Sequence, residues 1–167
     1  MSTPEGSNAY KVSLSFDKLS DTAVTLNSAS RRLNEAIEQL NTALKQLNLG
    51  IPVWVSTFTH EEGSIVDREE IGYARVKGKW GICIRRTIDG FNGPNPDETE
   101  WHFDDAPRDL RIRNVPFLHR VIDKLNDDAL RAAQQITESA TEAEELAKVI
   151  TIIAEKARPV KKNGGKQ

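Results

Sequence analysis

Hydrophobic residues recur along two long stretches of the chain at alternating steps of three and four positions. In the first stretch the repeated positions are Leu19, Ala23, Leu26, Ser30, Leu33, Ile37, Leu40, Leu44 and Leu47. In the second they are Val115, Leu118, Ile122, Leu125, Ala129, Ala132, Ile136, Ser139, Ala143, Leu146, Ile150, Ile153 and Ala157. A mean spacing of about 3.5 residues is typical of coiled-coil helices, which bury a narrow apolar stripe. The pattern predicts coiled-coil helices over residues 18–49 and 115–158.

Between the two helices, residues 51–114 show the pattern of β-structure. Residues 53–58, 71–76, 80–86 and 99–103 are short runs rich in β-branched and aromatic side chains. Lys77-Gly78-Lys79 is a hairpin turn with glycine where a positive φ is expected, and residues 61–70 and 89–98 have the composition of loops. We therefore expect an antiparallel meander of three or four strands.

These elements place the chain in the α+β class. A small antiparallel β-meander head is inserted between two long helices, and a compact insertion of this kind favours an antiparallel coiled-coil arm. Several alanines in the second stripe leave little apolar area for one helix pair. We therefore expect further helices to join it, with a homodimer as the favoured homo-oligomer.

The two ends of the chain lie outside the two predicted helices and the β head. Residues 1–17 have the polar composition of a disordered N-terminus, and residues 159–167 form a flexible basic tail. Within the N-terminal segment, residues 10–16 alternate apolar and polar side chains, which is the pattern of a short strand. In an antiparallel dimer this strand would lie near the partner's head and could complete the partner's sheet.

Charge and composition narrow the function classes. The 23 Lys and Arg nearly balance the 25 Asp and Glu, so no overall field attracts nucleic acid or an anionic membrane. The N-terminus has no signal-peptide core and no stretch is long and apolar enough to span a membrane, which indicates a cytoplasmic protein. Cys83, the one cysteine, lies in an apolar run and is expected to be a small buried side chain.

Candidate chemistry is sparse. His60 precedes two glutamates and His102 precedes Asp104 and Asp105, but no helical histidine pair supports a metal site. The sequence contains no phosphate-binding glycine loop and no nucleophile motif. We therefore expect no cofactor, no metal and no catalytic residue, and a protein that is not an enzyme.

Two sets of head residues are candidate binding groups. Arginines can bind a phosphate- or nucleotide-like anion in a forked geometry, or pair with neighbouring acids; they are Arg85, Arg86, Arg108, Arg111 and Arg113. Aromatic residues can form a partner-binding surface or fill a small core; they are Trp54, Tyr73, Phe91 and Trp101. The favoured function is a protein-interaction or scaffold protein that oligomerises and presents this head to an unknown protein partner. The alternative is a binding module for a small anion.

Overall fold

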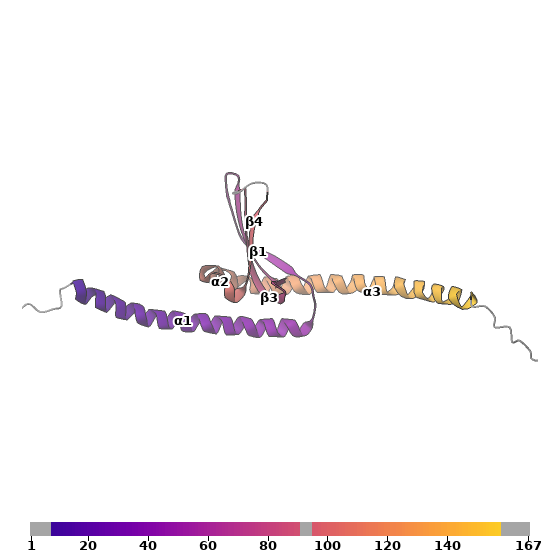
Figure 1. Cartoon of the computed structure of the whole chain (residues 1–167), viewed down its shortest axis with the longest axis horizontal. Helices are drawn as coiled ribbons and strands as arrows, with labels where there is room; N and C mark the ends of the chain where they lie inside the picture. The colour runs from indigo at the N-terminus through magenta and orange to yellow at the C-terminus, as the bar shows by residue number, and fades with distance from the viewer. Residues whose placement is uncertain (1–7, 91–94, 158–167) are drawn as a thin grey trace, which may run out of the picture. The chain divides into compact units, whose positions relative to one another are not determined.

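The computed structural model describes residues 8–90 and 95–157, and the chain divides into two compact units, Met1–Leu125 and Asn126–Gln167. Helix α3 begins in the first unit and continues into the second. The elements are α1 (Asn8–Leu47), β1 (Val53–Glu62), β2 (Ile65–Val76), β3 (Lys79–Asp89), β4 (Asp97–His102), the 3₁₀ helix η2 (Phe103–Asp105), α2 (Arg108–Asn114), the 3₁₀ helix η3 (Val115–Phe117) and α3 (Leu118–Lys156) (Figure 1).

The four strands form one antiparallel sheet in the order β1-β2-β3-β4, which is the predicted meander. Lys77 and Gly78 have φ angles of 48° and 83°, as a two-residue turn between β2 and β3 requires. The strands are longer than predicted, because residues 61–70 continue β1 and β2 into a second tight turn at Gly63. Apart from the adjacent Ile65 and Val66, this extension consists of polar residues and glycine, so it lacks the alternation that would have predicted a strand.

One face of the sheet forms the core. Its apolar residues meet the side chains of α2 and the beginning of α3, among them Leu110, Val121 and Leu125. The sheet contributes Val53, Val55, Ile71, Tyr73, Ile82 and Ile84. The opposite face carries Trp54, because successive side chains of a strand point to opposite sides.

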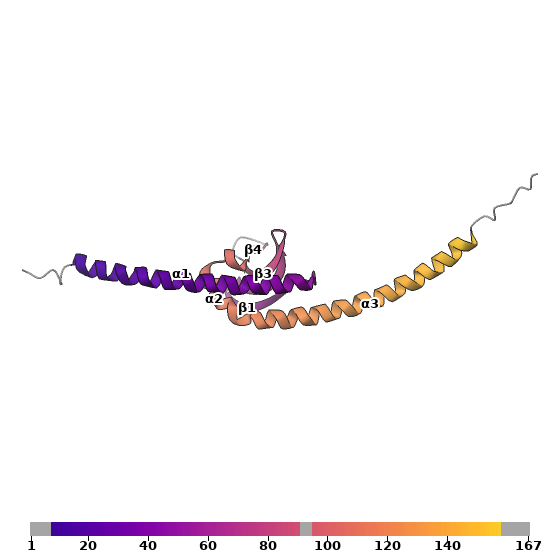
Figure 2. The same cartoon turned by 90° about the horizontal axis from the view of Figure 1, so that it is seen from below.

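Helix α1 packs against the edge of β3 (Figure 2). β4 pairs with β3 from Cys83 to Ile88, so the backbone N–H of Ile82 lies beyond the end of β4. That N–H donates a 2.7 Å hydrogen bond to Oδ1 of Asn41 in α1. Ile37 and Leu44, on either side of Asn41, are buried in the core. Asn41 therefore provides the acceptor for a strand N–H that β4 does not pair.

The predicted antiparallel coiled-coil arm is wrong. The α1 positions that would form its seam, Ile37 and Leu44, pack on the sheet instead of on a second helix. Leu33 and Leu40 are partly buried against the same core, whereas the seam positions farther from the sheet are exposed, including Leu19 in α1 and Ile150 in α3. The repeat misled the prediction because one stripe with a 3.5-residue spacing can cover a β-sheet as well as a helix.

The strand predicted at residues 10–16 is also wrong, because these residues form the beginning of α1. No glycine or proline interrupts residues 8–47, and the steps of three and four extend back through Phe16 to Val12. The exchange of an N-terminal strand between subunits loses its basis. The predictions for residues 1–7 and 159–167 lie outside the described residues. None of the helices in the described part of the chain is long and apolar enough to cross a membrane.

Candidate functional site

Arg85 is enclosed by acidic side chains. Its guanidinium lies 2.6 Å from a carboxylate oxygen of Glu70 and within 4 Å of Glu98 and Glu100. The same guanidinium stacks over the Trp54 ring at 4.3 Å from the ring centroid. These contacts compensate the charge of Arg85 within the protein.

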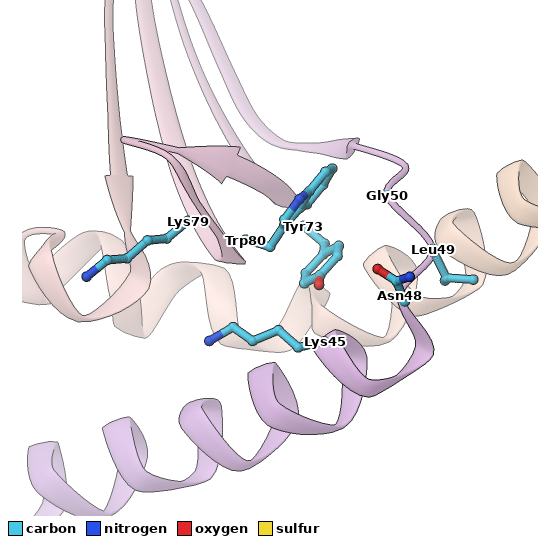
Figure 3. Close-up of a pocket in the computed structure, with 7 residues that line it drawn as sticks. All are labelled: Lys45, Asn48, Leu49, Gly50, Tyr73, Lys79 and Trp80. Carbon is cyan, nitrogen blue, oxygen red and sulfur yellow. The ribbon is translucent and has the colours of Figure 1, made fainter.

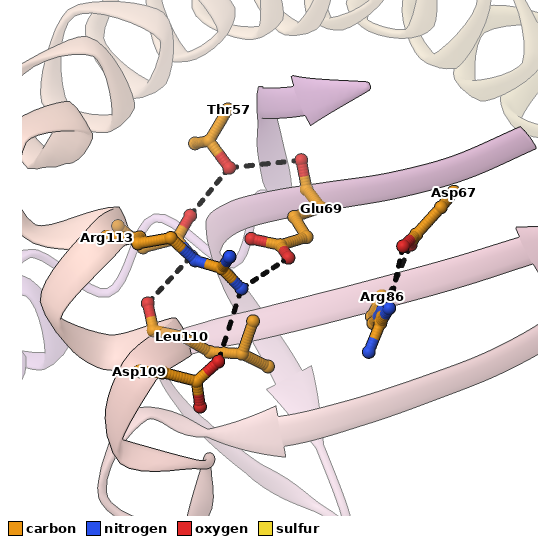
Figure 4. A network of polar contacts seen from close by, with 8 residues as sticks. Thr57, Asp67, Glu69, Arg86, Asp109, Leu110 and Arg113 are labelled. Carbon is orange, nitrogen blue, oxygen red and sulfur yellow. Dashed lines mark hydrogen bonds and ion pairs between the residues drawn. The ribbon is translucent and has the colours of Figure 1, made fainter. Parts of the chain in front are cut away.

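Arg86 and Arg113 pair with acids on the core side of the sheet (Figure 4). Nε and Nη2 of Arg86 donate to the two carboxylate oxygens of Asp67 at 2.9 and 2.6 Å, and this forked contact lowers the pKa of Asp67. Nη2 of Arg113 donates to Glu69 at 2.8 Å, and Glu69 is only 2% exposed. Removing Arg113 would therefore leave a buried carboxylate without its partner.

A buried amide joins α2 to the sheet beside this pair. Asn114 donates to the carbonyl of Leu110 at 2.8 Å, and its Oδ1 accepts from the Thr57 hydroxyl at 2.7 Å. The network satisfies buried polar groups at the junction of sheet and helix. Its members are structural, since their polar atoms are directed at one another.

The remaining two arginines connect α2 to α1. Arg108 lies 3.4 Å from Oδ1 of Asn27, and Arg111 donates to Oδ1 of Asn34 at 2.9 Å. The five arginines named as anion ligands are thus distributed over two faces of the sheet and the α1–α2 contact. Arg85, Arg86 and Arg113 pair with acids, as the alternative interpretation expected. Arg108 and Arg111 contact asparagines instead, and Nε of Arg111 is buried without a hydrogen-bond partner.

The aromatic candidates do not share one surface either. Trp54 lies on one face of the sheet, where a side chain on Gly72 would come within 2.7 Å of its ring. Trp101 is half-buried opposite Ile84 on the core face, and Tyr73 is buried on that face. Phe91 lies outside the described residues.

A pocket of about 400 Å³, here called the Trp80 pocket, opens between the end of α1 and the turn joining β2 to β3 (Figure 3). It is lined by Lys45, Asn48, Leu49, Gly50, Tyr73, Lys79 and Trp80. Tyr73 and Trp80 stack with ring centroids 5.4 Å apart and an interplanar angle of 24°. The pocket forms because Asn48 and Gly50, both with positive φ, turn the chain out of α1 and leave a gap beside this aromatic wall.

The polar groups of the Trp80 pocket are mostly hydrogen-bond donors. Lys79 makes no ion pair within the described residues, whereas Lys45 lies 3.7 Å from Glu38. Tyr73 is 3% exposed, and no described residue hydrogen-bonds its hydroxyl. Burial, followed by the nearby Cys83, raises the pKa of Tyr73, so the phenol stays protonated at neutral pH.

A second hollow of about 310 Å³ adjoins the Trp80 pocket and shares Lys45, Lys79 and Trp80 with it. Its acidic side chains are Glu38, Asp104 and Asp105. Burial and then the charge of Glu38 raise the pKa of Asp104. Among residues 8–90 and 95–157, no three or more His, Cys, Asp or Glu side chains are placed to hold a metal ion.

The buried Cys83 and the half-buried His102 are neighbours on the sheet. The thiol lies 3.6 Å from Nδ1 of His102, while Nε2 of that ring lies 2.9 Å from the Val76 carbonyl. Burial, together with the charge of Glu100, raises the pKa of Cys83 to about 12. A nucleophilic cysteine requires a thiolate, so this pair is suited to packing rather than to catalysis.

Comparison of the chain with protein-family models, with curated proteins and with solved structures finds no match. Sequence reasoning named Tyr73 but missed its pocket partners Trp80, Lys79 and Lys45. The Lys77-Gly78 turn was visible in the sequence and places Lys79 and Trp80 at the end of a hairpin. What the sequence did not show is that α1 ends beside this turn.

Proposed function

We propose that this protein is a non-enzymatic interaction protein that self-associates through exposed apolar faces of α1 and α3 and presents its β head to a protein partner. The observation that carries the proposal is the continuity of one apolar stripe along α1. Its C-terminal half is covered by the sheet, and its N-terminal half, here called the α1 stripe, is exposed. The α1 stripe consists of Val12, Phe16, Leu19, Ala23 and Leu26.

α3 repeats this arrangement. Val121 and Leu125 at its beginning are buried in the core, while the rest of the helix carries exposed apolar residues. The residues of this α3 stripe are Ile136, Ala143, Leu146, Ile150 and Ile153. Contiguous apolar surface of this kind marks an interaction site on a folded protein.

A second copy of the chain suits the α1 stripe because its margins carry no charge. The flanking positions are Ser13, Ser15, Ser20, Thr22, Asn27 and Ala29. Charged flanking residues select partners by attraction and repulsion, and identical charges oppose pairing of like helices. Uncharged margins remove that obstacle.

The α3 stripe is bordered on one side by alanine at every seventh position, namely Ala133, Ala140, Ala147 and Ala154. Alanine side chains add little bulk, so a partner helix can approach closely along this border. The stripe and the border together form a wide apolar face, which requires more cover than the narrow seam of a lone helix.

The head offers groups typical of protein interfaces on the face away from the core. Trp54 is half-buried, and its ring carries the Arg85 guanidinium. Tryptophan and arginine contribute strongly to binding energy at interfaces. The pairing of the five arginines within the protein argues against a phosphate site built on them.

Sedimentation of the full chain over a range of concentrations tests self-association. Ile152 and Ile153 are neighbours in α3 with similar exposure, 52% and 57%, but only Ile153 belongs to the α3 stripe. We expect the full chain to be a dimer or larger assembly, Ile153→Glu to dissociate it, and the matched control Ile152→Glu to leave it intact. Circular dichroism checks that both variants keep their helix content.

A full chain that is monomeric throughout the concentration range would refute the proposal. Equal dissociation by Ile152→Glu and Ile153→Glu would also refute it, because a general effect of charge on the helix would then explain the loss. The same comparison applies to α1, with Leu19→Glu in the stripe and Leu14→Glu on the opposite side as its control.

A further inference from the structure

The Tyr73 hydroxyl is the most informative group in the Trp80 pocket. A buried tyrosine normally directs its hydroxyl at a hydrogen-bond partner, and an unpaired polar group requires an explanation. Tyr73 is almost completely buried, yet its hydroxyl has no partner within the described residues and opens on the pocket (Figure 3). The hydroxyl oxygen itself is not among the buried atoms without a partner, so it is open to water or to a ligand on the pocket side.

The other polar groups of the pocket define what that partner must be. Lys45 and Lys79 carry ammonium groups, which only donate hydrogen bonds, and Asn48 contributes an amide. Since Lys45 is already close to Glu38, Lys79 is the cation left for a ligand. A ligand that accepts hydrogen bonds suits the phenol, and a negative charge on that ligand is favoured by the flexible Lys79 side chain, whose ammonium is directed away from the Tyr73 hydroxyl in Figure 3.

The wall of the pocket defines the rest of the ligand. The stacked rings of Tyr73 and Trp80 present an aromatic surface, and Leu49 adds an aliphatic one. A volume of about 400 Å³ lies in the range of small-molecule sites. A flat ring system can stack against Trp80 while its charged group meets the donors.

The surroundings limit the charge of the ligand. Glu38, Asp104 and Asp105 line the neighbouring hollow, and the end of α1 adds the partial negative charge of a helix C-terminus. A phosphate or nucleotide with two or more negative charges would meet more repulsion here than one free lysine offsets. A single carboxylate is the anion that fits.

We propose that the Trp80 pocket is a binding site for a small aromatic carboxylate, with the ring on Trp80 and the carboxylate on the Tyr73 hydroxyl, where a change of the Lys79 rotamer brings the ammonium to it. The site is independent of the proposed self-association, since none of its residues belongs to the α1 or α3 stripe. Binding is therefore expected to be the same in the full chain and in the Ile153→Glu variant.

Nuclear magnetic resonance of the indole N–H groups tests this site directly. The three tryptophans give three signals, and the Trp80→Phe variant identifies the one in the pocket. The probe is 2-naphthoate, with 2-naphthamide as the uncharged analogue and inorganic phosphate as an anion without a ring. We expect 2-naphthoate to shift the Trp80 signal saturably while the Trp54 signal, from the opposite face of the sheet, stays in place.

Three substitutions separate the contributions. Lys79→Gln removes the charge and should weaken 2-naphthoate binding about tenfold, the loss expected for one charge-assisted hydrogen bond. Tyr73→Phe should weaken binding several-fold without lowering stability, because its hydroxyl has no protein partner. The matched control Lys77→Gln lies in the same turn, outside the pocket lining, and should bind like the wild type.

Several results would overturn the site. These are an unchanged Trp80 signal, equal affinity for 2-naphthoate and 2-naphthamide, and saturation of the Trp80 shift by phosphate alone. If Lys77→Gln weakened 2-naphthoate binding as much as Lys79→Gln, the loss of affinity would be due to the overall charge of the turn and not to a contact with Lys79. Because self-association is measured separately by sedimentation, failure of one proposal leaves the other standing.

Discussion

Replacing Asn41 with alanine tests how α1 is attached to the sheet. Oδ1 of Asn41 accepts a 2.7 Å hydrogen bond from the backbone N–H of Ile82, at the edge of β3 that β4 leaves uncovered. Both residues are buried or nearly so, with exposed fractions of 9% and 0%. The substitution leaves a backbone donor without an acceptor inside the protein.

The magnitude follows from that orphaned donor. A buried N–H that loses its acceptor costs about 1–3 kcal/mol. Asn41 also lines the second hollow, so a water molecule entering from there can recover part of the loss. We therefore expect Asn41→Ala to lower the free energy of unfolding by about 1–2 kcal/mol.

Asn27→Ala is the matched control. Asn27 is exposed on the same helix, and its contact with Arg108 is a long one at 3.4 Å, so we expect a change within about 0.5 kcal/mol. Alanine raises helix propensity by a similar amount at both positions, so this term cancels in the comparison. Urea unfolding followed by tryptophan fluorescence, at one fixed protein concentration, gives both values. Equal stability of the two variants would refute the role assigned to Asn41.

Two further predictions concern titratable groups. Because Arg86 lowers the pKa of folded Asp67, the ionised carboxylate stabilises the fold above the unfolded pKa of about 3.9, and this contribution is lost as pH falls through the lower folded pKa. Urea midpoints of wild type and Asp67→Asn should therefore converge as pH falls below about 4, and a constant gap would contradict the ion pair. With its pKa raised to about 12, the buried Cys83 thiol should resist Ellman's reagent in the native protein at pH 8 and react fully in urea. Rapid native reaction would contradict its burial.

The sheet was predictable because its signals are local. Lys77-Gly78 lies between two apolar runs, and the turn chemistry alone specifies a hairpin. The outer ends of β1 and β2 were missed because most residues around the Gly63 turn are polar, and the apolar ones, Ile65 and Val66, are adjacent and do not alternate. Where neither face is buried, period-two alternation disappears, and only the turn residue remains as a signal.

The helices were predictable as helices but not in their contacts. An apolar stripe repeated every three and four residues indicates that one face of the helix is covered, but it does not indicate which element covers it. In α1, Ile37 and Leu44 meet the sheet, while Phe16 on the same stripe remains exposed. The choice between sheet and helix depends on tertiary geometry that periodicity does not encode.

The arginines show why candidate sites were harder still. Arg113 is one residue among several basic ones in the sequence, and only the fold places it beside the buried Glu69. The Trp80 pocket likewise joins residues from α1, β2 and β3 that are far apart along the chain. No local spacing could have revealed either arrangement.

One repeat in α1 does distinguish the covered half of its stripe from the exposed half. Leucine followed by asparagine recurs every seventh residue at Leu26-Asn27, Leu33-Asn34, Leu40-Asn41 and Leu47-Asn48. Asn27 and Asn34 contact two arginines of α2. Asn41 accepts a hydrogen bond at the edge of β3, and Asn48 ends the helix with a positive φ.

An asparagine can accept a hydrogen bond from an arginine or from an unpaired strand N–H, which are donors that the apolar face of another helix does not offer. Toward the N-terminus the same register continues as Leu19-Ser20 and Val12-Ser13. A serine hydroxyl can bond to its own helix backbone and requires no external partner. The change from asparagine to serine therefore coincides with the point where α1 leaves the head and where, under the proposed function, a second chain takes over the stripe.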